Sequence, residues 1–503
     1  MNTDSWQLGN AGGIRPMGAR WVVTGKMRLE TAAHLGGEGD VAVDMAVLRD
    51  PKEGVPLLPG TSLAGALRSY LADVIGGYRS SEQQEVEELF GAARSPKRQE
   101  PTAPSEGAPS DDPGSQSPLI VFDSLGTLPD GAGPEIRDGV AIDPATGTAE
   151  AHKKFDFEVL PAGTCFPVRV ELIVENLTRE AHLIGLLIAA LNGLTQGDIG
   201  LGMRRSRGLG AISAHDWKAV RHDLATPQGW LCWLTSDHEK PIGDHVPGHD
   251  AVAEAIRAAC PNLTIEEFAD RRRRLLVDLE LELAGDLLVR SPATDASSPD
   301  VVHLHSAGRP VLPGTGLAGA LRAQALRIAR IVRESQGDWG TFVDRLFGPR
   351  LRREDANSQG GQAMASRLRI SESFIENGQG RRQTRIAIDR FTGGVVRGAL
   401  FDEQVLAGGN LKVRLELRDP ADAEIGLLLL LLKDLLSGDI LVGGAVSVGR
   451  GVIRGTARVR LPDGKAYEIA KDLSVNEAAR QVFDKKIAAL HEAAPLKAEE
   501  ARS

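Results

Sequence analysis

The segment Val55–Leu71, VPLLPGTSLAGALRSYL, returns later in the chain as Arg309–Ala325, RPVLPGTGLAGALRAQA, with Pro59 matching Pro313 at an offset of 254. Further matches follow in the same order: Leu89-Phe90-Gly91 with Leu346-Phe347-Gly348 at an offset of 257, Ile142-Asp143 with Ile388-Asp389 at 246, and Ser206 with Ser447 at 241. An ordered series of matches indicates an internal duplication. The drifting offset means that the inserts between the matched elements differ in length.

Each half reads as strand, helix, strand, hairpin insert, strand, helix, strand. Apolar and polar residues alternate in Arg274–Leu283 (RLLVDLELEL), Leu411–Leu417 (LKVRLEL) and Val168–Val174, which is typical of half-buried strands. Leu63–Ile75 and Leu317–Val332 carry apolar residues at helical spacing instead. A βαββαβ order is the ferredoxin-like plan, which also underlies RNA-recognition modules. We therefore predict an α+β fold class with two modified ferredoxin-like (RRM-like) domains, each with an inserted β-hairpin.

The chain divides into four predicted regions. They are a first domain at 1–213, a connector at 214–273, a second domain at 274–460 and a C-terminal helical tail at 461–503. Residues from about 93 to 118 are rich in Pro, Ser and acidic residues and poor in apolar ones, so we expect a disordered loop there. The connector contains Trp217, Trp230 and Trp233 and is expected to fold. The tail is expected to dock through Val482, Phe483, Ile487 and Leu490.

The composition is that of a globular protein. The chain has 503 residues, 42% of them hydrophobic and 25% charged, which excludes a disordered, collagen-like or coiled-coil chain. A net charge of −9 argues against nucleic-acid binding through bulk positive charge and leaves room for a local basic surface. The three cysteines form no CxxC pair, so we expect no disulfide scaffold, no thiolate zinc site and a reducing, cytoplasmic location. We expect neither a signal peptide nor a membrane span.

Two features at equivalent places in both halves could bind phosphate. Glycine-rich segments, Gly197–Ile212 (GDIGLGMRRSRGLGAI) and Gly438–Ile453 (GDILVGGAVSVGRGVI), let backbone amides approach a phosphate, and their arginines would neutralise its charge. The Pro-Gly-Thr segments make Thr61 and Thr315 candidate helix N-caps, and the amides at a helix start can bind an anion. Both features also have ordinary interpretations, a flexible turn before a strand and simple helix capping. Their repetition favours a shared function.

Taken in order, these motifs resemble the RAMP superfamily, in particular the Csm-type backbone subunits of type III CRISPR effector complexes. In the first half the resemblance rests on Arg28–Gly37 (RLETAAHLGG), Val47–Pro51 (VLRDP), PLLPGTSLAGALR, LFG, Val140–Gly147 (VAIDPATG), Leu160–Gly163 (LPAG) and Ser206–Gly210 (SRGLG). The second half looks like another copy. The resemblance implies a modified ferredoxin-like fold in which the inserted hairpin is a thumb, at about Arg137–Leu160 and Arg382–Leu406.

The resemblance also implies a function. Such subunits stack along a CRISPR guide RNA, and each thumb pushes out a base pair of the guide–target duplex. Cleavage of the complementary target RNA occurs beside each displaced nucleotide and depends on a divalent ion, expected to be Mg²⁺, with an aspartate in the loop after the first strand as the key residue. The implied partners are the guide RNA, the target RNA and other effector subunits, namely a large subunit, a small subunit and other RAMP proteins. No membrane partner is expected.

Carried over to this sequence, the key aspartate is Asp44, which stands fifteen residues before Pro59. The second loop is shorter, and Asp300 stands thirteen residues before Pro313, so its equivalence requires a two-residue deletion. Asp295 is the other candidate there. An aspartate beside a splayed RNA backbone can position a 2′-hydroxyl or hold a divalent ion against the phosphate. We assign no residue as a direct metal ligand, and we expect Asp50, in Asp-Pro, to form a turn.

The candidate RNA contacts lie at the helix starts, in the glycine-rich loops and on the thumbs. Ala64 and Ala318 replace the lysine usual in the family, which leaves Arg68 and Arg322, about two turns into the helices. On the thumbs, basic residues offer charge for the RNA backbone, and Phe155 and Phe391 offer rings for an unstacked base. The RNA-binding candidates are His34, Gly60, Thr61, Ser62, Arg68, Lys153, Lys154, Arg204, Arg205, Ser206, Arg207, Gly208, Gly314, Thr315, Arg322, Arg385, Arg390, Ser447, Gly449 and Arg450.

Two alternatives stay open. The chain could be a non-catalytic RNA-binding scaffold of the same complex, in which neither aspartate acts. It could also process precursor guide RNA with His34 as a general base, since RAMP endonucleases often combine a histidine with a glycine-rich loop. The second half has no histidine at the matching Ala284-Gly285-Asp286.

Overall fold

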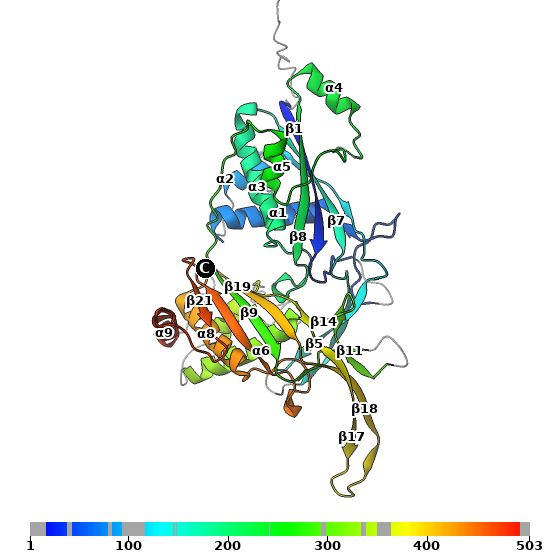
Figure 1. Ribbon diagram of the computed structural model, residues 1–503, viewed down its shortest axis with the longest axis vertical. Helices are drawn as coiled ribbons and strands as arrows, with labels where there is room; N and C mark the ends of the chain where they lie inside the picture. Colours follow the sequence, from blue (N-terminus) through cyan, green and yellow to red (C-terminus); the bar gives the residue numbers. More distant parts are fainter. Residues whose placement is uncertain are drawn as a thin grey trace, which may run out of the picture.

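The computed structural model describes residues 17–37, 43–78, 83–92, 116–143, 146, 148–240, 242–292, 298–332, 339–349 and 364–492. Most of the loop expected to be disordered, residues 93–115, lies outside the described residues, as does Asp295. The fold is of the mixed α+β class, and the two halves of the chain form two bodies around separate hydrophobic cores (Figure 1).

The first half is built on an antiparallel sheet of four strands. In spatial order they are β3 (Leu119–Val121), β7 (Cys165–Val174), β1 (Ala19–Leu29) and β8 (Ile212–Asp223). The helices that cover one face are α1 (Gly60–Gly76), α2 (Gln84–Phe90) and α3 (Glu180–Thr195), which share one core with the sheet (Figure 1). β8 runs beyond the predicted domain end at residue 213, because residues of the connector continue its pairing with β1.

The connector folds against the first half. α5 (Val252–Ala259) buries its apolar face in the first core. α4 (Pro227–Thr235) begins after Thr226, whose hydroxyl accepts a hydrogen bond from the Gly229 amide at 3.1 Å. Trp233 on α4 packs against Val22 of β1. The connector therefore belongs structurally to the first body.

A larger antiparallel sheet forms the second half. In spatial order its strands are β13 (His305–Ser306), β14 (Arg309–Leu312), β16 (Ser373–Glu376), β19 (Asn410–Arg418), β9 (Arg274–Leu283), β20 (Ile453–Arg460) and β21 (Ala466–Ile469), with β15 (Leu368–Ile370) also paired to β19. The helices of its core are α6 (Gly314–Val332), α7 (Trp339–Phe347), α8 (Asp422–Ser437) and α9 (Glu477–Glu492). α9 packs on α8 and buries Phe483 and Leu490, which confirms the expected docking of the tail. The segment predicted as a helical tail also contains the strand β21.

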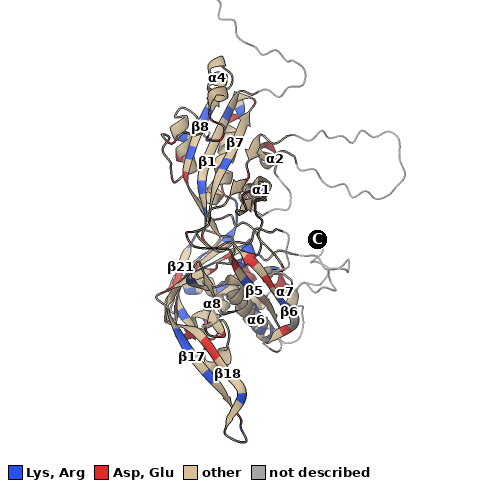
Figure 2. Cartoon of the chain, turned by 90° about the vertical axis from the view of Figure 1, so that its right-hand side faces the viewer, with Lys and Arg blue, Asp and Glu red and all other residues tan. Residues whose placement is uncertain are grey.

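A hairpin is inserted in each half before the strand that pairs antiparallel with the first long strand, which is β7 in the first half and β19 in the second. The first hairpin consists of β5 (Glu135–Ile142) and β6 (Ala149–Val159), and the second of β17 (Gln379–Ile388) and β18 (Val395–Ala407). The second hairpin projects from the body, with arginines on β17 facing acidic residues on β18 (Figures 1 and 2). Short strands beside the hairpins and helix starts are β2 (Leu57–Leu58), β4 (Ser124–Leu125), β10 (Asp286–Leu287), β11 (Arg290–Pro292) and β12 (Val301–His303).

The first hairpin and the first glycine-rich loop contact the second half, at a place that we call the junction. Arg137 on β5 binds Glu372 with two N–H···O bonds, one of them 2.9 Å long, and these two side chains are only 6% and 1% exposed. Gly208 lies so close to the second half that a Cβ there would stand 2.0 Å from the Glu372 nitrogen. Arg207 donates to the Phe347 carbonyl at 2.6 Å. These contacts fix the two halves relative to each other.

The two most apolar segments of the sequence are buried helices. α3 and α8 each bury most of their side chains in the core of their own half. None of the helices in the described ranges is both long enough and apolar enough to cross a membrane.

Candidate nucleic-acid interface and aspartate loops

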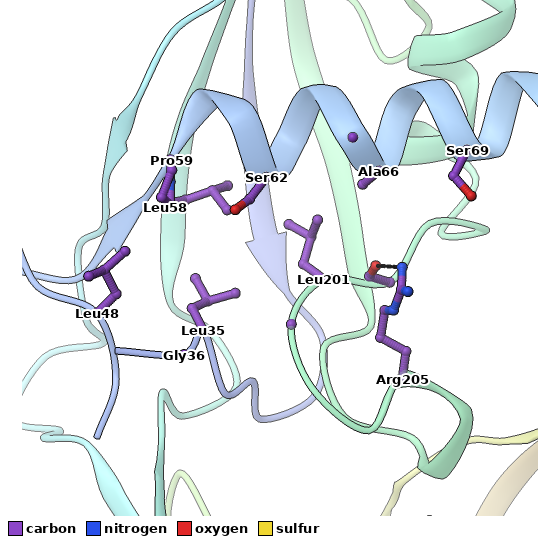
Figure 3. Close-up of a pocket in the computed structure, with 13 residues that line it drawn as sticks. Leu35, Gly36, Leu48, Leu58, Pro59, Ser62, Ala66, Ser69, Leu201 and Arg205 are labelled. Atoms are coloured by element: carbon purple, nitrogen blue, oxygen red, sulfur yellow. Dashed lines mark hydrogen bonds between the residues drawn. The ribbon is translucent and has the colours of Figure 1, made fainter. Parts of the chain in front are cut away.

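A groove of about 330 Å³ lies between the start of α1 and the glycine-rich loop of the first half (Figure 3). Its lining includes Ser62, Ala66 and Ser69 from α1 and Leu201 and Arg205 from the loop. Arg205 is exposed, and its guanidinium donates to a carbonyl of its own loop at 3.4 Å. The groove therefore brings together two of the features that the sequence predicted to bind phosphate.

The start of α1 differs from the prediction. The helix begins at Gly60 with Pro59 as its N-cap, so Thr61 lies exposed inside the first turn and does not cap it. The Gly60 amide donates to Oδ1 of Asp123 at 2.7 Å. A carboxylate of this chain thus occupies a position at the helix start where an external anion would be stabilised. The anion site expected at this helix start loses support.

The start of α6 shows the same shift. α6 begins at Gly314, which is buried, and Thr315 lies inside the first turn, so the N-cap prediction for Thr315 is also wrong. Arg322 forms an ion pair with Asp344 and donates to a backbone carbonyl at 2.7 Å, so its charge is engaged within the second half. At the matching position of α1, Arg68 is partly exposed.

The arginines of the first glycine-rich loop point in different directions. The guanidinium of Arg204 lies over the rings of Phe155 and Phe157, at 4.7 and 4.8 Å, and burial lowers the pKa of Arg204. Arg207 points into the junction, where burial lowers its pKa to about 10 and still leaves it charged at neutral pH. Arg205 faces the groove (Figure 3). Of the three, Arg205 is therefore the one available to a ligand in the groove.

Two other predicted contacts in this loop are less accessible. Ser206 is half-buried in the short helical turn Arg205–Arg207. Gly208 is buried in the junction, at a φ of +91° that favours glycine, so its requirement for glycine comes from the contact between the halves. The structure therefore assigns Arg207 and Gly208 to the junction and not to an RNA-facing surface.

The glycine-rich loop of the second half has a different chemistry. Arg450 is only 3% exposed and binds Glu403 at 2.9 Å. Arg385 on β17 binds the same carboxylate at 2.8 Å. Arg450 and Arg385 share this one carboxylate within the second half, so Arg450 does not face solvent as the sequence predicted. Ser447 and Gly449 remain exposed on this loop.

Basic residues on the hairpins are accessible. Lys153 and Lys154 on β6 are exposed, and each pairs with a carboxylate of the same hairpin, at 2.7 and 3.0 Å. Arg390 lies at the tip of the second hairpin with its guanidinium 4.5 Å from the centre of the Phe391 ring, and both side chains are exposed. The second hairpin thus presents both the charge and the ring that the sequence predicted there, whereas on the first hairpin only the charge is exposed, because Phe155 is half-buried between Arg204 and Phe157.

His34 is buried, with 4% of its surface exposed. Its Nδ1 lies 2.7 Å from the carbonyl of Glu158, and its own carbonyl accepts the amide of Met203 from the glycine-rich loop. In the second half the loop amide of Gly444 binds the carbonyl of Leu288 in the same way, so the counterpart of His34 is Leu288 and not the segment 284–286. An RNA contact and a general-base role for His34 both lose support, because the ring is enclosed.

Asp44 is exposed in a loop that runs beside β6. Its amide donates to Oδ1 of Asp156 at 2.9 Å, and the Asp156 amide donates to Oδ2 of Asp44 at 3.0 Å. Further along the loop, the Val47 amide donates to Glu158 at 2.9 Å. Asp50 accepts hydrogen bonds from two following amides at 3.0 and 2.7 Å, which confirms its predicted turn. The loop is therefore held against the first hairpin, with the Asp44 carboxylate at its exposed edge.

Asp300 is held in the same way in the second half. It is exposed, and its Oδ2 accepts a hydrogen bond from the amide of Asp402 on β18 at 3.2 Å, just as Oδ2 of Asp44 accepts from the amide of Asp156. Backbone pairing gives the same register: Met45 pairs in parallel with Phe157, and Val301 pairs in parallel with Glu403. Asp300 is therefore the structural counterpart of Asp44, despite the two-residue deletion.

The Asp44 carboxylate fits a single protein ligand of a divalent ion. Its Oδ1 makes no hydrogen bond to a described residue. Mg²⁺ is usually held by one or two carboxylates together with waters and substrate phosphates. Within the described ranges, no three His, Cys, Asp or Glu side chains form a group that could hold a metal ion. The carboxylate therefore suits an ion shared with an RNA phosphate.

Four residues that organise these loops and the junction were not predicted from the sequence. A signal existed for two of them: FDFE at 155–158 and FDEQ at 401–404 share the offset of the Ile-Asp match, and they contain Asp156 and Glu158. Arg137 and Glu372 had no comparable signal, because an ion pair between residues so far apart in the chain leaves no local pattern.

Comparison with known proteins places this arrangement in a family. The model of the RAMP superfamily matches residues 26–213 and 280–454, one segment in each half. A protein of Enterococcus italicus named "CRISPR system Cms endoribonuclease Csm3" is 37% identical over 81 residues, which are 14% of this chain and 38% of that protein. The protein of the same name from Streptococcus thermophilus is 34% identical over 77 residues, 14% of this chain and 35% of that protein. The chain thus spans little more than a third of the length of these relatives. The family segments cover more than half of the chain, and the chain belongs to the RAMP superfamily as a tandem, Csm-type member.

Proposed function

We propose that this chain is a guide-RNA-binding backbone subunit of a type III CRISPR effector, and that it cleaves complementary target RNA at Asp44 and Asp300. The observation that carries the proposal is a repeated arrangement: in each half an exposed loop aspartate accepts the amide of an aspartate on the inserted hairpin. One such aspartate is an ordinary loop feature. Two in equivalent places, in a tandem member of this family, support a shared function.

We further infer that each half is a modified ferredoxin-like domain whose hairpin is the thumb. The strand order supports this. In the first half, β1 and β7 lie at the centre of the sheet with β8 and β3 at its edges. In the second half, β9 and β19 lie between β20 and β15. Both orders are those expected when a βαββαβ chain forms one antiparallel sheet with its helices on one face.

Cleavage would take place where a loop aspartate meets the base of a hairpin. In this proposal the hairpin splays the guide–target duplex, and the Asp44 carboxylate then orients a 2′-hydroxyl or holds a divalent ion, Mg²⁺, at the phosphate. When bound, the ion would neutralise charge that develops on the phosphate. The chain itself supplies the position of the carboxylate, because the loop is hydrogen-bonded along β6.

The guide RNA backbone would lie in the groove beside α1. Arg205 supplies a positive charge there, and Ser62 and Ser69 supply hydroxyl groups that can bind phosphate oxygens (Figure 3). A local groove of this kind is compatible with a net charge of −9, since affinity depends on charge near the phosphates. Further partners in this proposal are the target RNA and the other effector subunits, namely a large subunit, a small subunit and other RAMP proteins.

The test is cleavage of a labelled complementary RNA in Mg²⁺ by the complex assembled with guide RNA. We expect Asp44→Ala and Asp300→Ala each to lose a different product, and Asp50→Ala, a turn residue of the same loop, to retain both. If both products persist in the two aspartate variants while RNA stays bound, the chain is a non-catalytic scaffold. Cutting of precursor repeat RNA by the isolated protein, lost in His34→Ala, would instead establish the processing function, which the burial of His34 disfavours.

A further inference from the structure

We infer that Asp156 is a positioning residue for Asp44, and that its side chain acts by holding the Asp44 amide and not by contacting RNA or an ion. The inference rests on the proposed function, because it concerns the aspartate proposed to support cleavage. It assigns a residue of the first hairpin to the cleavage site and gives its carboxylate one defined task.

The geometry is a closed ring of two hydrogen bonds. The Asp44 amide donates to Oδ1 of Asp156 at 2.9 Å, and the Asp156 amide donates to Oδ2 of Asp44 at 3.0 Å. An exposed aspartate on a loop otherwise samples several side-chain rotamers. Because the ring fixes both the backbone and the side chain of Asp44 to one point of β6, Oδ1 of Asp44 is held in place while it makes no hydrogen bond to a described residue.

The neighbouring contacts explain why the side chain of Asp156 matters at this point. Two residues further along β6, the amide of Glu158 donates to the Met45 carbonyl, and its carboxylate binds the Val47 amide and Arg49. These contacts hold the middle of the loop. Asp156 holds the end of the loop that carries the carboxylate, where a loss of order would displace the reacting group.

The second half provides an internal comparison. The amide of Asp402 donates to Asp300 at 3.2 Å, so the backbone half of the ring is present there. The side chain of Asp402 instead binds Arg382 at 2.7 Å and Thr384 at 3.3 Å, and it makes no bond to the Asp300 amide. The structure therefore predicts that two equivalent aspartates differ: the side chain of Asp156 positions its partner, and the side chain of Asp402 does not.

The experiment compares Asp156→Ala, Asp156→Asn and Asp402→Ala in the full complex with guide RNA, following both products in Mg²⁺. We expect Asp156→Ala to slow formation of the first product by about tenfold, the low end for losing a group that orients a ligand. Asp156→Asn should stay within about twofold of the wild type, because its amide oxygen still accepts the Asp44 amide. Asp402→Ala should leave the second product unchanged.

Several results would overturn the inference. An equal loss of the first product in Asp156→Asn and Asp156→Ala would show that the negative charge acts directly. An unchanged rate in Asp156→Ala would show that the hydrogen bond to the Asp44 amide does not contribute to cleavage. A loss of both products, or of target binding, would show a general structural defect. The proposed function is tested separately by Asp44→Ala. If that variant keeps the first product, both ideas fail, whereas loss in Asp44→Ala without loss in Asp156→Ala refutes the inference alone.

Discussion

Removing Glu372 should open the junction between the two halves. Glu372 pairs with Arg137, their side chains are 1% and 6% exposed, and Nε of Arg137 has no hydrogen-bond partner that could compensate. Breaking a buried ion pair from one side costs about 3–5 kcal/mol, because the remaining charge stays buried without a partner. We therefore expect Glu372→Ala to shift the equilibrium between closed and open junction by roughly two to four orders of magnitude.

Hydrogen exchange of the amides in β5 and around Glu372 measures this opening directly. The control is Glu376→Ala, which removes a pair with Arg309 that is 3.0 Å long and more than half exposed on both sides, and which should cost less than about 1 kcal/mol. The double variant Arg137→Ala/Glu372→Ala should be less destabilised than Glu372→Ala, since no charge is left unpaired. Equal protection of the junction amides in Glu372→Ala and Glu376→Ala would refute the reasoning.

Three further outcomes follow from single residues. Gly208→Ala should lower the free energy of unfolding in urea by at least about 1 kcal/mol more than Gly449→Ala: both have φ above +80°, but a Cβ would stand 2.0 Å from a backbone nitrogen at the first and meets nothing within 4 Å at the second. Equal losses would argue against the close contact. Burial lowers the pKa of His303 to about 4, so as the pH falls the unfolded chain takes up a proton on His303 before the folded chain does. The contribution of His303 to the free energy of unfolding should therefore fall by about 3 kcal/mol between pH 6.5 and 4. His303→Gln should flatten the pH dependence of the free energy of unfolding between pH 6.5 and 4, and an unchanged dependence would contradict this role of His303. Arg205→Ala should reduce the steepness with which the association constant for guide RNA falls with salt concentration, on logarithmic axes, by about 0.7 in filter binding. This is the value for one phosphate contact with a single strand. An identical slope in the variant and the wild type would show that Arg205 does not contact the RNA.

The sheets could be predicted because their signals are local. Apolar and polar residues alternate along β9 and β19, and the structure pairs these strands along their whole length with the apolar faces turned to the helices. The long apolar segments became α3 and α8, as expected for helices buried on several sides. In each case, the residues that decide the structure are neighbours in the sequence.

The directions of the arginines could not be predicted. Arg205 and Arg207 are two residues apart in one loop, yet one faces a groove and the other donates to Phe347 in the other half of the chain. Arg450 is buried and binds Glu403 on the second hairpin. A basic residue looks the same in the sequence whether it meets a phosphate or a carboxylate of its own chain, so burial decides its role and tertiary structure decides burial.

The choice between Asp295 and Asp300 also needed the structure. Spacing from Pro313 alone left both open, because the loop had changed length. The amide of Asp402 and the parallel pairing of Val301 place Asp300 as the counterpart of Asp44. The Phe-Asp pair repeated on the two hairpins is a sequence signal for this register.

The most direct test of the central claim is target cleavage by a complex that carries Asp44→Ala together with Asp300→Ala. The complex should still bind the guide RNA and its complementary target with wild-type affinity, because neither carboxylate lies in the groove beside α1. We predict that it produces no cleavage at either position in Mg²⁺. Undiminished cleavage by the complex that carries both substitutions and still binds its target would contradict the account. The chain would then bind RNA without cleaving it.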